Sequence, residues 1–190
     1  MAVSCDPVLE HTNQVQTMAL DFPKPLIAAI NGACVGFGFN QTSFCDLRFA
    51  AAGAKITTAF ARRGLIAGHA IAWVLPRLVG RANALDMLLS ARMILAEEAQ
   101  VLGWVQRVFP AETLLKEAVA YAEELASLSA PRSMAVIKAQ VYAAESSSLF
   151  DALAAADRLM LESFRTAEFR EGVASFIEMR SPAFPGLGSR

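Results

Sequence analysis

The hydrophobic and polar positions of this 190-residue chain follow a helical spacing through its C-terminal half. Apolar residues recur there every three or four positions, which places them on one face of a helix. The stripes predict four amphipathic helices, around Leu114–Leu128, Met134–Val141, Leu149–Phe164 and Phe169–Phe176. Alanine, the strongest helix former, occupies 36 positions and supports the same interpretation.

The N-terminal half alternates strand and helix signals. A continuous apolar run at Leu26–Ile30 ends at the Asn31-Gly32 turn, a pattern typical of a strand buried on both faces. A helix is predicted from Gly36 to Cys45, and strands follow at Leu47–Ala52 and Lys55–Thr58. This order of strand, helix and strand predicts an α/β fold.

Further elements fill the region between the two halves. The predicted helices there are Ala70–Val79, Ala82–Ala91 and Ala96–Leu102, and the predicted strand is Trp104–Phe109. A short helix from Asp6 to Phe22 is expected to stop at Pro23. Because Ala130-Pro131 separates the last helices from the rest, we expect an α/β core over residues 1–130 and a helical region with a tail over residues 131–190.

Charge and hydropathy exclude several partner classes. The formal net charge is −1, and lysine and arginine are scattered, so the basic patch of a nucleic-acid or anionic-membrane binder is missing. The apolar runs are far shorter than the roughly 20 residues of a membrane helix. Met1–Val8 lacks the pattern of a secretion signal, and we expect a cytoplasmic protein.

Few residues offer metal or nucleophile chemistry. The three cysteines Cys5, Cys34 and Cys45 fit neither a disulfide framework nor a metal knuckle, so free thiols are expected. His11 and His69 are the two histidines, and no metal site is predicted. Five aromatic residues are expected in the core rather than at a ligand: Phe37, Phe39, Phe44, Phe60 and Trp73.

One stretch carries a family resemblance. The residues Lys24–Gly38, read as KPLIAAINGACVGFG, are followed by CDLRFA at Cys45–Ala50. Matching segments continue at Gly64–Ile66, Leu75–Gly80, Ala96–Ala99, Gly103–Val105 and Glu171–Phe176. Over roughly Phe22–Phe184 the chain resembles the crotonase (enoyl-CoA hydratase/isomerase) superfamily.

The resemblance implies a core of repeated ββα turns, followed by C-terminal helices that assemble subunits into a homotrimer or hexamer. It implies acyl-CoA thioester substrates, with coenzyme A as part of the substrate and no separate cofactor. It also implies an oxyanion hole of two backbone N–H groups that stabilises a thioester enolate. By position one donor is the N–H of Phe37, flanked by Gly36 and Gly38. The alternative is that these glycines only form a tight strand-to-helix turn.

The family's acidic positions are substituted here. The two hydratase glutamates correspond to Asn40 and Phe60, and the acid of the isomerases corresponds to Gly68. None of these side chains can act as a base, so the three positions are expected to be inactive. His69 is a candidate base one residue further on, or else a polar residue at a helix start. Neighbouring residues on a helix point about 100° apart, which argues against a simple replacement.

A second difference lies at the start of the chain, where Met1 almost coincides with the helix before Lys24-Pro25. The resemblance places the first ββα turns and the second oxyanion donor upstream of this point, so the core is expected to be N-terminally shortened. Three interpretations stay open: an enoyl-CoA hydratase or isomerase, a non-catalytic subunit that assembles with itself or a full-length paralogue, and a gene product whose true start lies upstream.

Overall fold

The computed structural model describes residues 18–187, which pack as two compact units. The first unit contains Leu26–Ala118, and the second contains Asp21–Pro25 with the chain from Val119 onward. The division falls inside helix α6 (Leu114–Leu128). The domain boundary expected at residues 130 and 131 stays a prediction.

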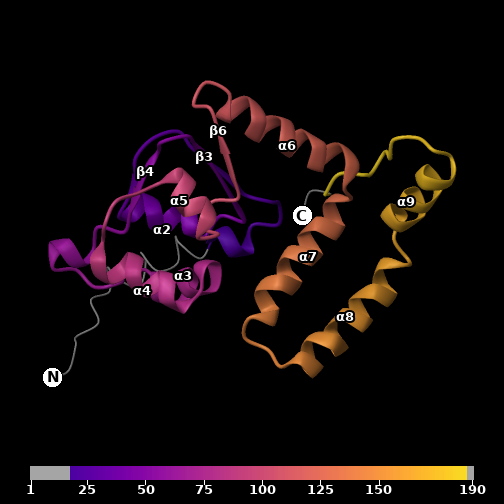
Figure 1. Cartoon of the computed structure of the whole chain (residues 1–190). Helices are drawn as coiled ribbons and strands as arrows, with labels where there is room; N and C mark the ends of the chain where they lie inside the picture. The colour runs from indigo at the N-terminus through magenta and orange to yellow at the C-terminus, as the bar shows by residue number, and fades with distance from the viewer. Residues whose placement is uncertain (1–17, 188–190) are drawn as a thin grey trace. The chain divides into compact units, whose positions relative to one another are not determined.

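Two small sheets organise the first unit. One is parallel, with strand order β1 (Ile27–Ile30), β3 (Leu47–Ala51) and β6 (Arg107–Phe109), so that β3 lies at its centre (Figure 1). In the other, β2 (Cys34–Val35) pairs parallel to β4 (Lys55–Thr57), and β4 pairs antiparallel to β5 (Ile94–Leu95). Parallel pairing between strands that a helix connects is the arrangement expected of an α/β unit.

Short helices connect these strands. They are α2 (Phe37–Ser43), the 3₁₀ turn η1 (Ala61–Arg63), α3 (Ile71–Val79), α4 (Arg81–Ser90) and α5 (Ala96–Val101). The core that they enclose contains Phe39 stacked on Trp104, with ring centroids 4.6 Å apart. The predicted α/β fold is therefore confirmed.

A buried arginine fixes the C-terminal end of α2. Arg48, on β3, is almost completely buried and donates from Nη1 to the carbonyl oxygen of Cys45 at 2.6 Å and from Nε to that of Trp104. The indole N–H of Trp104 donates to Oγ of Ser43 at 3.0 Å. Since buried polar groups are costly when unpaired, these bonds stabilise one placement of α2 against the central strand.

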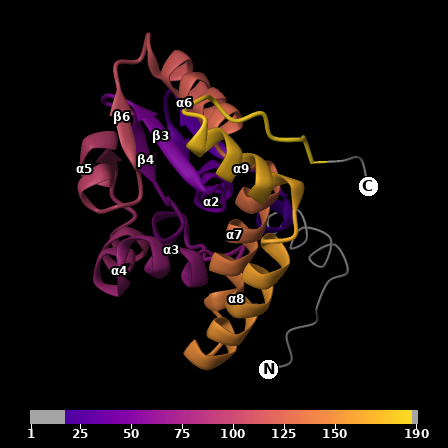
Figure 2. The same cartoon turned by 90° about the vertical axis from the view of Figure 1, so that its right-hand side faces the viewer.

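The second unit consists of helices. After α6 come α7 (Pro131–Ala144), α8 (Leu149–Ser163) and α9 (Ala167–Ile177). Ser148 and Thr166 cap α8 and α9, each accepting a backbone N–H through its hydroxyl oxygen. Figure 2 shows α7 and α8 side by side, and the buried carboxylate of Glu168 accepts the N–H of Arg132 at 3.0 Å. The four predicted C-terminal helices are confirmed.

Several expectations from the sequence are corrected. The first strand is not buried on both faces, because Ala29 is exposed. The strands β2 and β5 were not predicted, and the strand expected from Trp104 begins only at Arg107. Phe37 and Trp73 are exposed rather than in the core. Most of the helix expected over Asp6–Phe22 lies outside the described residues.

Candidate functional site

The N-terminus of α2 presents unpaired backbone donors. Gly36, between β2 and α2, has φ 56° and ψ −112°, a conformation that glycine adopts most easily. Its N–H donates to the carbonyl oxygen of Thr57 at 3.2 Å, which fixes the turn on β4. The first hydrogen bond of α2 runs from the N–H of Asn40 to the oxygen of Gly36. The preceding N–H of Phe37 therefore has no acceptor within residues 18–187.

Asn40 lies one turn along α2 and is fully buried, with 0% of its surface exposed. Its Nδ2 donates to the carbonyl oxygen of Gly68 at 3.4 Å, which also accepts the N–H of Ile71 at 3.2 Å. Oδ1 of Asn40 is buried and has no hydrogen-bond partner among the described residues. Such an orphaned acceptor costs about 1–3 kcal/mol. Asn40 thus joins α2 to the segment before α3, at a cost in stability.

The structure places His69 outside any helix. Gly68, His69 and Ala70 form a turn, and α3 begins only at Ile71. His69 has φ 53° and Ala70 has φ 56°, so both adopt the left-handed conformation. The His69 ring meets the Phe37 ring edge-on, with centroids 5.7 Å apart and planes at 86°. His69 thus lies directly before the N-cap of α3, at the helix start where the sequence placed it, and its chemical role stays a prediction.

Four predicted site positions come together and one stands apart. Phe37, Asn40, Gly68 and His69 are joined by the contacts above, with Gly38 on the same turn of α2. Phe60 is half-buried at the start of η1, where its carbonyl oxygen accepts N–H groups from Arg63 and Leu65. No hydrogen bond or ring contact found in the described part links Phe60 to the other four. We call Phe37, Asn40, Gly68 and His69 the α2–turn cluster.

The two described cysteines form no metal site. Cys34 and Cys45 are not joined by a disulfide, and burial raises the pKa of Cys34, whose Sγ lies 3.3 Å from Oγ1 of Thr42. Cys5 and His11 lie outside the described residues. Within residues 18–187, no group of three or more metal-binding side chains occurs.

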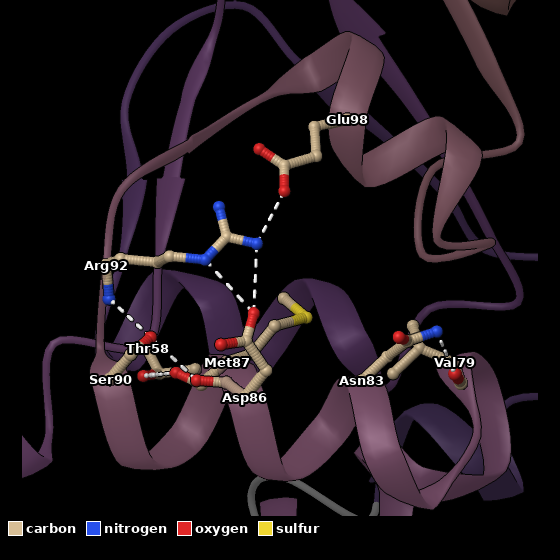
Figure 3. Close-up of polar contacts among 8 residues, drawn as sticks. All are labelled: Thr58, Val79, Asn83, Asp86, Met87, Ser90, Arg92 and Glu98. Atoms are coloured by element: carbon tan, nitrogen blue, oxygen red, sulfur yellow. Dashed lines mark hydrogen bonds and ion pairs between the residues drawn. The ribbon is translucent and has the colours of Figure 1, made fainter.

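Sequence reasoning missed an ion-pair network between α4 and α5. Arg92 donates from Nε and Nη2 to Oδ2 of Asp86 at 3.0 and 2.9 Å, and from Nη2 to Glu98 at 2.5 Å (Figure 3). The hydrogen bond from Arg92 holds the pKa of Glu98 below its usual value. Because both carboxylates are bonded to a guanidinium, they are poor candidates for a general base. In the sequence, Asp86, Arg92 and Glu98 are three charged residues spaced six positions apart, and this spacing alone does not predict an ion-pair network.

The second unit contains a groove of about 330 Å³ between α7 and α8. Its walls combine apolar side chains such as Ile137 and Met160 with Ser133, Ser163 and Glu168. Nothing in the structure shows what fills this groove. Among residues 18–187, every helix is too short or too polar to cross a membrane.

Comparisons with known proteins identify a family that the chain matches. The family model for enoyl-CoA hydratase/isomerase matches residues 6–187. The 1,2-epoxyphenylacetyl-CoA isomerase of Escherichia coli is 35% identical over 164 residues, which cover 86% of this chain and 62% of that protein. A probable enoyl-CoA hydratase of Mycobacterium bovis is 38% identical over 160 residues, 84% of this chain and 62% of its own length. The chain thus spans about 62% of the length of these curated relatives.

Solved structures give the same match. An enoyl-CoA hydratase from Bacillus anthracis superimposes with a TM-score of 0.90 at 28% identity, covering 96% of this chain and 72% of that one. An enoyl-CoA hydratase from Mycobacterium marinum is 56% identical with a TM-score of 0.63, covering 67% of this chain and 64% of that one. Both similarities include sequence as well as fold.

Proposed function

The chain belongs to the enoyl-CoA hydratase/isomerase family, and on that premise we propose that it binds acyl-CoA thioesters through the backbone N–H of Phe37. The N–H donates to the thioester carbonyl oxygen and stabilises the negative charge that develops there in an enolate. Coenzyme A is part of this substrate, and no separate cofactor is proposed. A cytoplasmic location stays a prediction.

The observation that carries the proposal is the unpaired N–H of Phe37. The left-handed Gly36 ends β2, and the N–H of Phe37 follows it with no protein acceptor in the described part of the chain. The Phe37 side chain is 55% exposed, so this turn lies at the surface rather than in the core. A donor that needs no reorganisation when charge develops is worth several kcal/mol in acyl-group chemistry.

Hydration by two glutamates is not part of the proposal. Asn40 is an amide bonded to Gly68, Phe60 is a hydrocarbon, and Gly68 has no side chain. None of them can take a proton from water at neutral pH. We expect crotonyl-CoA hydration to be very slow or absent in a spectrophotometric assay. A rate within tenfold of a two-glutamate homologue, measured under the same conditions, would contradict this expectation.

A second candidate is a non-catalytic subunit that assembles with itself or with a full-length paralogue. The observation in its favour is the exposed apolar surface of α8 and α9, where Phe150 is 80% and Phe176 84% exposed. Apolar surface of this extent is typical of an interface. Both candidate functions are compatible with this exposed surface. A measurement of acyl-CoA binding distinguishes them.

The test compares two substitutions of Phe37 by calorimetric titration with butyryl-CoA. Phe37→Pro removes the N–H at the first helical position, where proline fits the backbone. Phe37→Ala removes the ring and keeps the N–H. We expect proline to abolish binding and alanine to retain it. Equal damage by the two substitutions, or binding that survives proline, would contradict the role of this backbone donor.

A further inference from the structure

We propose that His69 is the acid–base residue of the α2–turn cluster. Its imidazole removes the α-proton of a bound acyl-CoA thioester and returns a proton to the resulting enolate. This inference rests on the proposed binding of the thioester at Phe37, and it assigns the proton transfer to a residue outside the positions where the family carries its acids.

The first observation is the backbone conformation of the turn. His69 and Ala70 are consecutive non-glycine residues with φ 53° and 56°. Each left-handed residue of this kind is strained relative to ordinary backbone. Strain of this kind is concentrated at functional sites.

The second observation is where the imidazole lies. The His69 and Phe37 rings form a T-shaped pair, and the backbone N–H of Phe37 is the donor proposed for the thioester oxygen. His69 is half-buried, so its ring packs against the protein and still reaches solvent. Hence one residue, Phe37, carries the oxygen-binding donor in its backbone and positions the imidazole with its side chain.

The third observation is the bond that holds this turn. The buried amide of Asn40 donates to the carbonyl oxygen of Gly68, directly before His69, while its own Oδ1 stays unpaired. A fully apolar side chain would avoid that orphaned acceptor. We therefore assign Asn40 as a positioning residue that fixes the turn of His69 against α2.

The chemistry balances without another reactant. The neutral imidazole nitrogen takes the α-proton, the C–H bond breaks, and its electron pair forms the carbon–carbon double bond of the enolate. The charge moves to the thioester oxygen, which accepts the N–H of Phe37. The imidazolium then gives a proton back to the α-carbon. In D₂O this cycle replaces the α-hydrogens of the acyl group with deuterium.

The experiment measures deuterium incorporation into butyryl-CoA by mass spectrometry. His69→Gly is the main variant, because glycine accepts a positive φ and this change leaves the turn unstrained. His11→Gln is the matched control, since it removes the other histidine of the chain. General acid–base catalysis contributes about 10²- to 10⁴-fold, so His69→Gly is expected to lose at least about 100-fold of the exchange rate.

Two further readouts separate catalysis from folding. Added imidazole is expected to restore part of the exchange by His69→Gly, which a purely structural role would not allow. Asn40→Leu is expected to lower the maximal exchange rate while the dissociation constant for butyryl-CoA stays unchanged. A lower rate with unchanged affinity is expected if Asn40 acts by positioning His69 rather than by binding the substrate.

The outcomes distinguish this inference from the proposed function. Wild-type protein that binds butyryl-CoA but catalyses no exchange, or His69→Gly that exchanges at the wild-type rate, overturns the role of His69 and leaves the binding proposal intact. Wild-type protein that does not bind butyryl-CoA overturns both. Loss of exchange in His69→Gly, with binding retained and rescue by imidazole, supports the inference.

Discussion

At the scale of single residues, Asn40 belongs to the candidate site and lowers the stability of the fold, because its buried amide is only partly hydrogen-bonded. Its amide makes one long hydrogen bond to Gly68, whose oxygen is also bonded to the N–H of Ile71. Its Oδ1 has no partner within residues 18–187. If an apolar side chain replaces the amide of Asn40, the carbonyl oxygen of Gly68 keeps its hydrogen bond from Ile71. The same change removes the unpaired acceptor Oδ1.

Asn40→Leu is accordingly expected to leave the free energy of unfolding unchanged or to raise it by about 1 kcal/mol. Leucine has the same branch point and the same number of side-chain heavy atoms as asparagine but bulkier methyl groups, so no cavity forms. Asn40→Ala is the control, and the cavity that it leaves is expected to lower the free energy of unfolding by about 1–2 kcal/mol. Urea denaturation measures both. A loss above about 2 kcal/mol in Asn40→Leu would contradict this expectation.

At the scale of elements, a carboxylate on α9 holds the segment that follows this helix. Glu171 accepts Arg180 Nη1 at 2.5 Å and Nη2 at 3.0 Å, and it accepts the N–H of Ala183 at 2.7 Å. The hydrogen bonds, first from Arg180 and then from Ala183, lower the pKa of Glu171 from 4.5 to about 2. The ring of Phe184, the next residue, lies where a side chain at Gly172 of α9 would meet it.

The lowered pKa gives this contact a defined pH dependence. A carboxylate with a folded-state pKa below its unfolded value stabilises the folded state above pH 4.5, and this contribution is lost as the pH falls towards 2. We expect the protection factor of the Ala183 N–H in hydrogen exchange to fall over that range. Glu171→Gln should lower the protection at neutral pH. Glu178→Gln, the control, should not, because Glu178 bonds Arg180 and not Ala183.

The sequence predicted the long elements and missed the short ones for physical reasons. The amphipathic period is visible over the 15 residues of α6 or α8, whereas β2 and β5 are two residues long and show no period. The predicted helix Ala70–Val79 agrees with α3 to within one residue, but the left-handed turn before it was missed because His69 and Ala70, its two positive-φ residues, are not glycines. The contact between His69 and Phe37 joins residues 32 positions apart in the sequence, so no local pattern could reveal it.

At the scale of the whole molecule, the C-terminal helices expose several large apolar side chains. On α8, Leu149 and Phe150 are exposed, and on α9 so are Phe176 and Ile177. Removing apolar surface from water contributes about 25 cal/mol per Å². From this exposed surface we predict that the chain associates with further copies of itself.

We expect the protein to associate as a trimer or a multiple of one in light scattering at micromolar concentration. Phe176→Asp is expected to weaken the association at least tenfold, because a charge would be buried in the interface. Arg170→Asp on the same helix is the control and should have a smaller effect. A well-behaved monomer of the wild-type protein would contradict the prediction.

The most direct test of the account observes the thioester carbonyl itself. Butyryl-CoA labelled with ¹³C at the carbonyl is bound to the protein, and the infrared band of the label is compared with its position in water. Polarisation by the N–H of Phe37 predicts a shift to lower wavenumber in the wild type and in Phe37→Ala, and no such shift in Phe37→Pro. A carbonyl band that stays at its frequency in water while butyryl-CoA is bound would contradict the account.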